Sequence, residues 1–336
     1  MKDNDLIVIR LSSLGDVAML VPVLISFHFK FPNSRVKLIS REHFRPIFEM
    51  LTFVEYIAID KSNSKLSFID LIHFFINLDL KRNHIILDLH NVIRSKILRF
   101  LFGIYRNPCY VIDKGREEKK KMIKFESKKL VQLKSSFERY REVFEKANFH
   151  FELQSNAFLE RTIAEKNIPW IGIAPFSKHK SKEYSLSKLR KTLELISSKH
   201  EVKFFIFGYG ENELTLTQEL CRDIPNTEIF INSASFTEEL NIISSLDLMI
   251  SMDSGNGHLA ANYGIPVITL WGTTHPCLGY GTYAQPLENS LLPNSKRFPF
   301  LPVSIFGNNK IASYERAIDS IEVDTIVQRV SKILNS

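Results

Sequence analysis

The stretch between residues 248 and 276 constrains the fold of this chain more than any other part of the sequence. An apolar run, Leu248–Met252, leads into a small polar turn, and a short helix built on His258 and the three residues after it follows. A glycine and a proline then stop this helix before a second apolar run, Val267–Leu270. This order predicts a strand–helix–strand unit of a parallel sheet, whose ligands bind at the carboxyl ends of the strands.

The turn of this unit reads Asp253-Ser254-Gly255-Asn256-Gly257. Its two glycines let a backbone approach a ligand closely, and the N–H groups at the start of the following helix suit phosphate or another anion. An ordinary tight connection, in which Asp253 caps the helix, explains the same residues. The turn alone leaves both interpretations open.

The length of 336 residues exceeds that of one typical core and predicts two domains. The formal net charge of +7 predicts an acidic partner, and nucleic acid, anionic lipid and phosphorylated sugars all qualify. The three cysteines, Cys109, Cys221 and Cys277, have neither metal-site nor disulfide-framework spacing, which indicates a reducing compartment. No apolar run is long enough for a signal peptide or a membrane span, so we expect a cytoplasmic protein.

Short apolar runs alternate with amphipathic stretches along the whole chain. In the first half the expected strands are Leu6–Leu11, Val36–Ser40, Val54–Ile59, Ile85–Leu89 and Cys109–Ile112. The expected helices there include Val17–Phe31, His43–Met50, Phe68–Leu78, Val92–Phe102 and Val131–Ala147. A second series begins with the strand Trp170–Pro175.

This alternation predicts an α/β protein with two doubly wound, Rossmann-like domains that face a central cleft. We expect the first domain at residues 1–160 and the second at 168–315. For residues 316–336 we expect a C-terminal amphipathic helix that could pack back on the N-terminal domain.

The first strand runs into a turn that contains two hydroxyl residues, one glycine and a carboxylate, Ser12-Ser13-Leu14-Gly15-Asp16. A helix start favours a carboxylate and lowers its pKa, so Asp16 could act as a general base towards an acceptor hydroxyl. A helix cap is the alternative role. Because the turn lacks the G-x-G-x-x-G pattern, a nicotinamide-dependent oxidoreductase finds no support.

Two turns in the second half also carry polar groups at strand ends. After the strand at Val202–Phe207 comes a glycine turn with Glu211 and Glu213, where an acid could accept hydrogen bonds from ribose hydroxyls or cap the helix. The loop of residues 176–184 contains Lys178, Lys180 and Lys182, any of which could neutralise a diphosphate or simply be solvated.

The segment of residues 114–129 has eight basic and three acidic residues. A solvated loop or helix face is one interpretation, and a docking site for an anionic acceptor or a membrane is the other. The single aromatic residue among these charges, Phe125, does not make the interleaved stacking surface that nucleic-acid binding uses, so we expect no nucleic-acid partner.

Taken together, the motif SSLGD of residues 12–16 and the stretch MDSGNGHLAANYGIPVITLWGTTHP that begins at Met252 resemble the heptosyltransferases, the family 9 glycosyltransferases that build the inner core of lipopolysaccharide. The resemblance covers most of the chain and is weakest in residues 114–169. It implies a GT-B glycosyltransferase, with an acceptor-binding N-terminal domain and a C-terminal domain that binds a nucleotide sugar.

The resemblance also implies an inverting, metal-independent transfer without a cofactor, in which Asp16 is the catalytic base. On the donor side it implies nucleotide-sugar contacts from Lys182, Glu211 (or Glu213), Asp253, Ser254, Gly255 and His258. On the acceptor side it implies Arg10, Ser13, His90, Asn91 and Arg94.

The partners implied are a nucleotide-sugar donor, ADP-heptose, and an anionic, lipid-linked saccharide acceptor of the lipopolysaccharide core. The basic balance permits peripheral contact with the cytoplasmic face of the inner membrane without requiring it. A different nucleotide sugar and a non-catalytic nucleotide-binding module remain the alternatives. The chain departs from the family in a longer loop before Lys182, in Tyr184 without a Trp-Pro pair, and in Asn256-Gly257 before His258.

Overall fold

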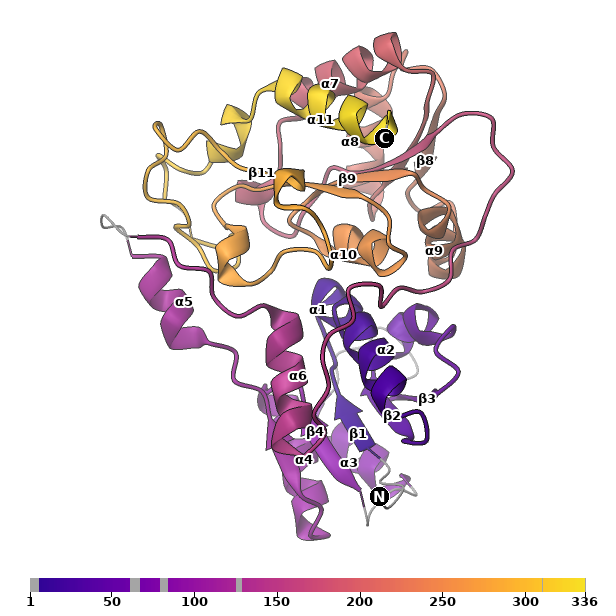
Figure 1. Cartoon of the computed structure of the whole chain (residues 1–336), viewed down its shortest axis with the longest axis vertical. Coiled ribbons are helices and arrows are strands. Elements are labelled where there is room, and N and C mark those ends of the chain that lie inside the picture. The colour runs from indigo at the N-terminus through magenta and orange to yellow at the C-terminus, as the bar shows by residue number, and fades with distance from the viewer. Residues whose placement is uncertain (1–5, 61–66, 79–83, 125–128, 310, 336) are drawn as a thin grey trace. The chain divides into compact units, whose positions relative to one another are not determined.

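The computed structural model describes all residues except 1–5, 61–66, 79–83, 125–128, 310 and 336 (Figure 1). The chain divides into two compact units. Unit 1 comprises Met1–Lys114 and Ser136–Phe158, and unit 2 comprises Gly115–Ser135 and Leu159–Ser336. Each unit is built around its own parallel sheet.

The sheet of unit 1 has the strand order β3-β2-β1-β4-β5, and all of its strand pairs are parallel. Its strands are β1 (Leu6–Ile9), β2 (Val36–Ser40), β3 (Val54–Ala58), β4 (Ile85–Asp88) and β5 (Cys109–Val111). The first strand is buried along its whole length, as its apolar sequence predicts for a strand covered on both faces. All five strands expected in this half of the chain are therefore present.

Helices cover both faces of this sheet. They are α1 (Leu14–Ala18), α2 (Leu20–Lys30), α3 (Phe68–Ile76), α4 (Ile93–Ile104) and α6 (Ser136–Lys146). Crossovers that run in opposite directions along the sheet place their helices on opposite faces. Accordingly, α3 and α4 share one apolar core with β1, while α2 packs against α6 on the other side through Phe27 and Phe144.

Two helices of unit 1 differ from the sequence-based expectation. The expected helix Val17–Phe31 is two helices, α1 and α2, which meet at Met19. Pro22 lies in the first turn of α2 and has no N–H to donate to the preceding turn, which explains the break. The expected helix His43–Met50 is a 3₁₀ helix, η1 (Glu42–Phe48), with Pro46 inside it.

The sheet of unit 2 has the order β11-β10-β9-β6-β7-β8 and is also parallel. Its strands are β6 (Trp170–Ala174), β7 (Lys203–Phe207), β8 (Thr227–Phe230), β9 (Leu248–Met252), β10 (Val267–Leu270) and β11 (Ser290–Leu291). Its helices are α7 (Leu186–Lys199), α8 (Glu211–Leu220), α9 (Phe236–Ser244), α10 (Gly255–Asn262) and α11 (Val323–Leu334). The strand–helix–strand unit predicted from residues 248–276 is β9, α10 and β10.

The C-terminal helix α11 packs in unit 2 (Figure 1). Its apolar side chains Ile326, Val327 and Val330 join the core formed by α7 and the sheet, and α11 lies against α7. The expected C-terminal helix of residues 316–336 is therefore α11, and it belongs to unit 2. Its apolar stripe completes the covering of the second sheet.

The segment Gly115–Ser135 also belongs to unit 2, although it precedes α6 of unit 1 in the sequence. It contains α5 (Arg116–Met122), and Met122 and Leu133 pack with Cys277, Leu278 and Tyr280. The Leu133 N–H donates to the Cys277 carbonyl at 2.9 Å. The expected helix Val131–Ala147 therefore begins only at Ser136, and part of the basic segment 114–129, residues 125–128, lies outside the described residues.

A substitution at Gly279 can test whether the segment Gly115–Ser135 packs against the rest of unit 2. Its φ is +84°, and a Cβ atom there would lie 2.3 Å from the Lys134 carbonyl oxygen. We expect Gly279→Ala to lower the free energy of unfolding by about 2 kcal/mol or more, since it adds left-handed strain to a backbone clash. Gly281→Ala is the matched control, because a Cβ atom there meets nothing within 4 Å. Equal urea midpoints for the two variants would contradict the docking.

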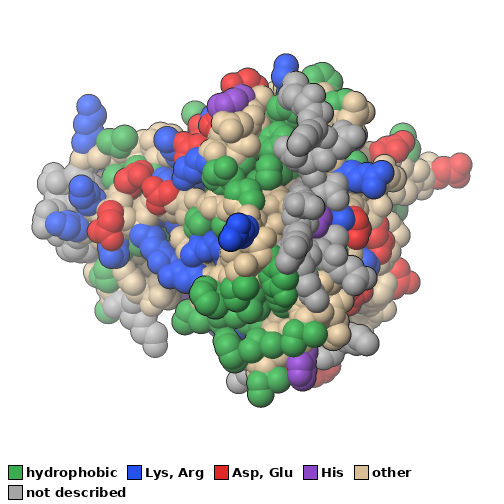
Figure 2. Space-filling model, turned by 90° about the horizontal axis from the view of Figure 1, so that it is seen from below, with side chains coloured by type: hydrophobic (Ala, Val, Ile, Leu, Met, Phe, Trp, Pro, Cys, Tyr) green, Lys and Arg blue, Asp and Glu red, His purple; other side chains and the backbone are tan. Residues whose placement is uncertain are grey.

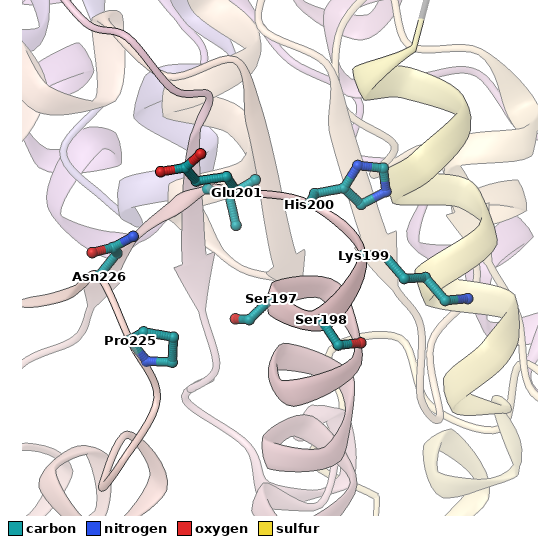
Figure 3. Close-up of a pocket in the computed structure, with 8 residues that line it drawn as sticks. Ser197, Ser198, Lys199, His200, Glu201, Pro225 and Asn226 are labelled. Carbon is teal, nitrogen blue, oxygen red and sulfur yellow. The ribbon is translucent and has the colours of Figure 1, made fainter.

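A surface pocket of about 340 Å³ lies in unit 2 at the end of α7 (Figure 3). Its lining residues, 197–202 and 225–226, come directly before β7 and β8. The pocket is thus at the amino ends of the strands. Parallel sheets bind their ligands at the opposite edge, which is where the polar turns of this chain lie.

Candidate active site

In each sheet the chain order reverses direction at one place, and such a switch point is where doubly wound folds bind ligands. The switch point of unit 1 lies between β1 and β4, and that of unit 2 between β6 and β9. The turn with Asp16 follows β1, and His90 follows β4. In unit 2 the loop with Lys182 follows β6, and Asp253 follows β9. These four predicted residues therefore lie at the two switch points, whereas Glu211 follows β7.

Asp16 is held in one orientation by an arginine and a serine. Its Oδ2 lies 2.6 Å from Arg10 Nη2 and accepts a 2.8 Å hydrogen bond from Ser13 Oγ. Arg10 is only 4% exposed and also donates to the Leu89 carbonyl at the end of β4, whereas the Asp16 side chain is 32% exposed. The buried cation thus supports a carboxylate that remains partly open to solvent.

This environment keeps Asp16 ionised. Partial burial opposes ionisation, but the Arg10 guanidinium and the Ser13 hydrogen bonds outweigh it, so the pKa of Asp16 lies below its usual value. Asp16 is also the third residue of α1 and forms a capping box with Ser13. The structure therefore shows the helix cap that the sequence allowed, and the same contacts hold the carboxylate in one orientation.

His90 lies beside this carboxylate. Its Nδ1 accepts from the Leu11 N–H at 3.4 Å, and its Nε2 lies 3.5 Å from Ser12 Oγ. Burial, and then the charges of Arg10 and Lys114, lower the pKa of His90 to about 3. His90 is therefore neutral at physiological pH, and Lys114, the first residue of the basic segment, contributes its charge to this site.

The remaining acceptor-side residues have different surroundings. The Asn91 N–H donates to the buried Asp88 carboxylate, and its side-chain amide donates to the Ile112 carbonyl, so Asn91 shapes the turn after β4. Arg94 is exposed in the first turn of α4, and its charge acts on His90. Asp88 also pairs with Arg99 at 3.2 Å, which anchors this turn to α4.

Lys182 and Asp253 form the centre of the site in unit 2. The Lys182 ammonium lies 2.8 Å from Asp253 Oδ2, and the same oxygen accepts from Thr274 Oγ1 at 2.8 Å. Both ionic side chains are largely buried. Lys180 instead points to Glu183 and is 77% exposed, and Lys178 is exposed as well. Of the three candidate lysines, Lys182 is the one that the structure brings to the turn after β9.

The turn after β9 begins the helix α10, whose N-cap is Ser254 and whose first residue is Gly255. Asp253 therefore does not cap the helix. His258 is buried within α10. A Cβ atom on Gly257 would lie 2.9 Å from Ser251 Oγ, so this glycine permits helix–strand packing. Gly255 is the first residue of α10, whose first-turn N–H groups have no partner within the helix.

The two glutamates after β7 also separate. Glu211 is exposed at the start of α8, and its carboxylate accepts from Asn232 Nδ2 at 2.9 Å. Glu213 accepts from the Tyr209 N–H at 2.8 Å, and burial raises its pKa. Glu213 therefore stabilises the glycine turn, while Glu211 is the acid that solvent reaches.

Two contributors were missed from the sequence. Tyr140 of α6 donates from its hydroxyl to the Asp16 carbonyl at 3.0 Å, and Arg10 lies over its ring. Thr274 holds Asp253 from the loop after β10. No local pattern marks Tyr140, because 124 residues separate it from Asp16. Thr274 does lie at a strand end of the sheet, which was an available signal.

Within the described part of the chain, His, Cys, Asp and Glu side chains form no group of three or more that could hold a metal ion. No helix among these described residues has the length and apolar character that a membrane span requires.

Three solved structures share this fold over nearly their full lengths. The E. coli heptosyltransferase WaaC with ADP is 17% identical, with a TM-score of 0.69, and the match covers 98% of this chain and 99% of that one. The family 9 glycosyl transferase from Veillonella parvula is 18% identical, with a TM-score of 0.73 and coverage of 100% and 99%. The E. coli ADP-heptose lps heptosyltransferase II is 13% identical, with a TM-score of 0.71 and coverage of 98% of each chain.

Two parallel α/β units of this kind, each with its polar residues at a switch point, define a GT-B glycosyltransferase fold. The model of glycosyltransferase family 9 (heptosyltransferase) matches residues 76–296, more than half of the chain. The chain therefore belongs to glycosyltransferase family 9, as the two sequence motifs indicated, and is a glycosyltransferase. A sequence comparison with curated proteins gave no significant match.

Proposed function

We propose that this enzyme transfers heptose from ADP-heptose to a lipid-linked acceptor of the lipopolysaccharide core, with inversion and without a metal ion. The observation that carries the proposal is the Asp16–Arg10 pair, which supplies an oriented, ionised carboxylate at the switch point of unit 1. Support for the donor comes from solved structures of the same fold, since E. coli WaaC has been determined with ADP and with ADP-2-deoxy-2-fluoro heptose.

In the proposed reaction, Asp16 removes the proton of an acceptor hydroxyl while that oxygen forms a bond to the anomeric carbon of the heptose. The bond from the anomeric carbon to the diphosphate breaks on the opposite side, and ADP leaves with the electron pair. Arg10 and Ser13 orient the carboxylate, and the neutral His90 donates from Nε2–H to the acceptor, because its Nδ1 accepts from the Leu11 N–H. Arg94 and Asn91 complete the proposed acceptor side.

On the donor side, Lys182 compensates the charge that develops on the leaving diphosphate, a role in which a metal ion is not required. The amides at Ser254 and Gly255 bind a phosphate at the start of α10, and Asp253 and His258 contact the sugar or the diphosphate. Glu211, the exposed acid after β7, accepts from the ribose hydroxyls. In this proposal Asp16 acts on the acceptor hydroxyl, and Lys182 acts on the leaving diphosphate.

Nucleotide binding is the direct test of the donor. We expect ADP to raise the melting temperature by several degrees and by the same amount with and without Mg²⁺, because a ligand that binds only the native state stabilises it in proportion to ln(1 + [L]/Kd). GDP and UDP at equal concentration are the matched controls. A larger shift with GDP or UDP would replace the donor, and an ADP shift that depends on Mg²⁺ would overturn the metal-independent mechanism.

A further inference from the structure

Helices α3 and α4 of unit 1 expose large apolar side chains. Six of them are 57–78% exposed, namely Phe68, Ile69, Ile76, Ile93, Phe100 and Ile104. Figure 2 looks at the protein from the end at which α3 and α4 lie in Figure 1, and hydrophobic side chains gather there beside Lys and Arg. Single exposed apolar residues are ordinary, but a contiguous group of this size marks an interaction surface.

Helix α4 is apolar on two opposite sides. Its inner side, with Leu98 and Phe102, is buried in the core against the sheet. Ile93, Phe100 and Ile104 follow one another at intervals of seven and four residues, which places them in one stripe on the outer side. A helix that only had to cover the sheet would carry polar residues there.

The outer side of α3 continues this stripe. Helices α3 and α4 contact one another and share one core, in which Leu71 and Phe75 are the buried residues of α3. Ile69 and Ile76, seven residues apart, lie away from that core and are exposed. Because both helices lie on the same face of the sheet, their outer stripes form one surface, which we call the α3/α4 face.

The charge on the α4 side of this face is positive, while α3 carries one exposed acid, Asp70. Helix α4 contains no acidic residue, and its exposed Arg94 and Lys96 flank the apolar stripe, with the exposed Arg106 just beyond its end. A second copy of this chain bound through the same face would bring these cations against one another, because a two-fold interface pairs a patch with itself. An anionic bilayer complements both features, since apolar side chains enter the acyl boundary while Lys and Arg meet the headgroups.

We propose that the α3/α4 face docks on the surface of an anionic lipid bilayer. Membrane docking rests on the proposed function in one respect, because a lipid-linked acceptor requires the enzyme to work at a membrane. It assigns the contact to the acceptor-side unit, and not to the basic segment of residues 114–129, most of which belongs to unit 2.

The test is sedimentation of the full chain with vesicles of phosphatidylcholine, with and without phosphatidylglycerol. We expect binding to the phosphatidylglycerol vesicles that weakens in high salt. The double variant Phe100→Ser/Ile104→Ser should bind them at least about tenfold more weakly, because it removes two inserting side chains. Lys96→Glu should weaken the same binding through charge alone.

Phe29→Ser is the matched control, since Phe29 is 74% exposed on α2, at the other face of the same sheet. It should bind vesicles as the unaltered protein does. An equal loss in Phe29→Ser, or unchanged binding in the double variant, would overturn the proposal. So would a protein that binds no vesicles but forms a dimer that the double variant abolishes. The ADP melting shift of the same proteins tests the donor separately, so either proposal can fail alone.

Discussion

Asp16→Asn is expected to lower kcat by about 10²–10⁴-fold, the usual contribution of a positioned general base. The variant retains an acceptor for the Arg10 and Ser13 hydrogen bonds but cannot take up the proton of the acceptor hydroxyl. Stabilisation by ADP should be unchanged, because the residues proposed to bind the donor lie in unit 2. Asp16→Ala should lose as much turnover and also some stability, since it leaves the buried Arg10 without this partner.

Asp70→Asn is the matched control for a simple capping role. Asp70 is the third residue of α3 and forms a capping box with Ser67, as Asp16 does with Ser13 in α1. If Asp16 only capped its helix, the two substitutions would both lower the melting temperature slightly and leave kcat alone. That outcome, measured with donor and acceptor at saturation, would remove Asp16 from the mechanism.

The direction of the Asp16 pKa shift sets the pH dependence expected of this base. Because the folded-state pKa is lowered, the carboxylate is ionised at every pH above its ordinary value of about 3.9. The Arg10 pair therefore contributes its stability fully above that pH, and this contribution is lost as the pH falls through the lower folded-state value. An acid limb in kcat/KM centred above about pH 5 would contradict Asp16 as the base.

The fold could be predicted from the sequence because parallel strands that are buried on both faces are continuous apolar runs. Leu6–Ile9 and Leu248–Met252 are entirely buried, and no helical periodicity competes with them. What the pattern could not show was which unit a connecting segment joins. Residues 131–135 look like the start of α6, but a hydrogen bond to Cys277 and packing near Gly279 place them in unit 2.

The polar turns were predictable for a related reason, since the carboxyl ends of neighbouring parallel strands meet at one edge of a sheet. That rule locates Asp16, His90 and Asp253, but it cannot choose among several side chains on the same loop. Lys178, Lys180 and Lys182 are equivalent in sequence, and only the 2.8 Å contact with Asp253 separates them. The role of Tyr140 could not be predicted from the sequence either, because its contact with Asp16 depends on how α6 packs against the sheet.

Lys182→Ala should raise the donor KM, or the Kd for ADP, by about 10- to 100-fold, which corresponds to one or two hydrogen bonds to a charged group. It should also destabilise the protein by about 3 kcal/mol, because the largely buried Asp253 carboxylate loses its cation. Lys180→Ala is the matched control, since Lys180 is exposed and pairs only with its neighbour Glu183 among the ion pairs that the structure describes. It should change neither the Kd for ADP nor the melting temperature measurably.

The double variant Lys182→Ala/Asp253→Asn separates the two effects of Lys182. Neutralising Asp253 removes the unpaired buried charge, so the melting temperature should return most of the way to that of the unaltered protein. The loss of ADP affinity should remain, because a diphosphate has no substitute for the ammonium group. If the double variant recovered both its stability and its ADP affinity, Lys182 would serve only to neutralise Asp253. Another group, such as the amides at the start of α10, would then have to stabilise the charge of the leaving diphosphate.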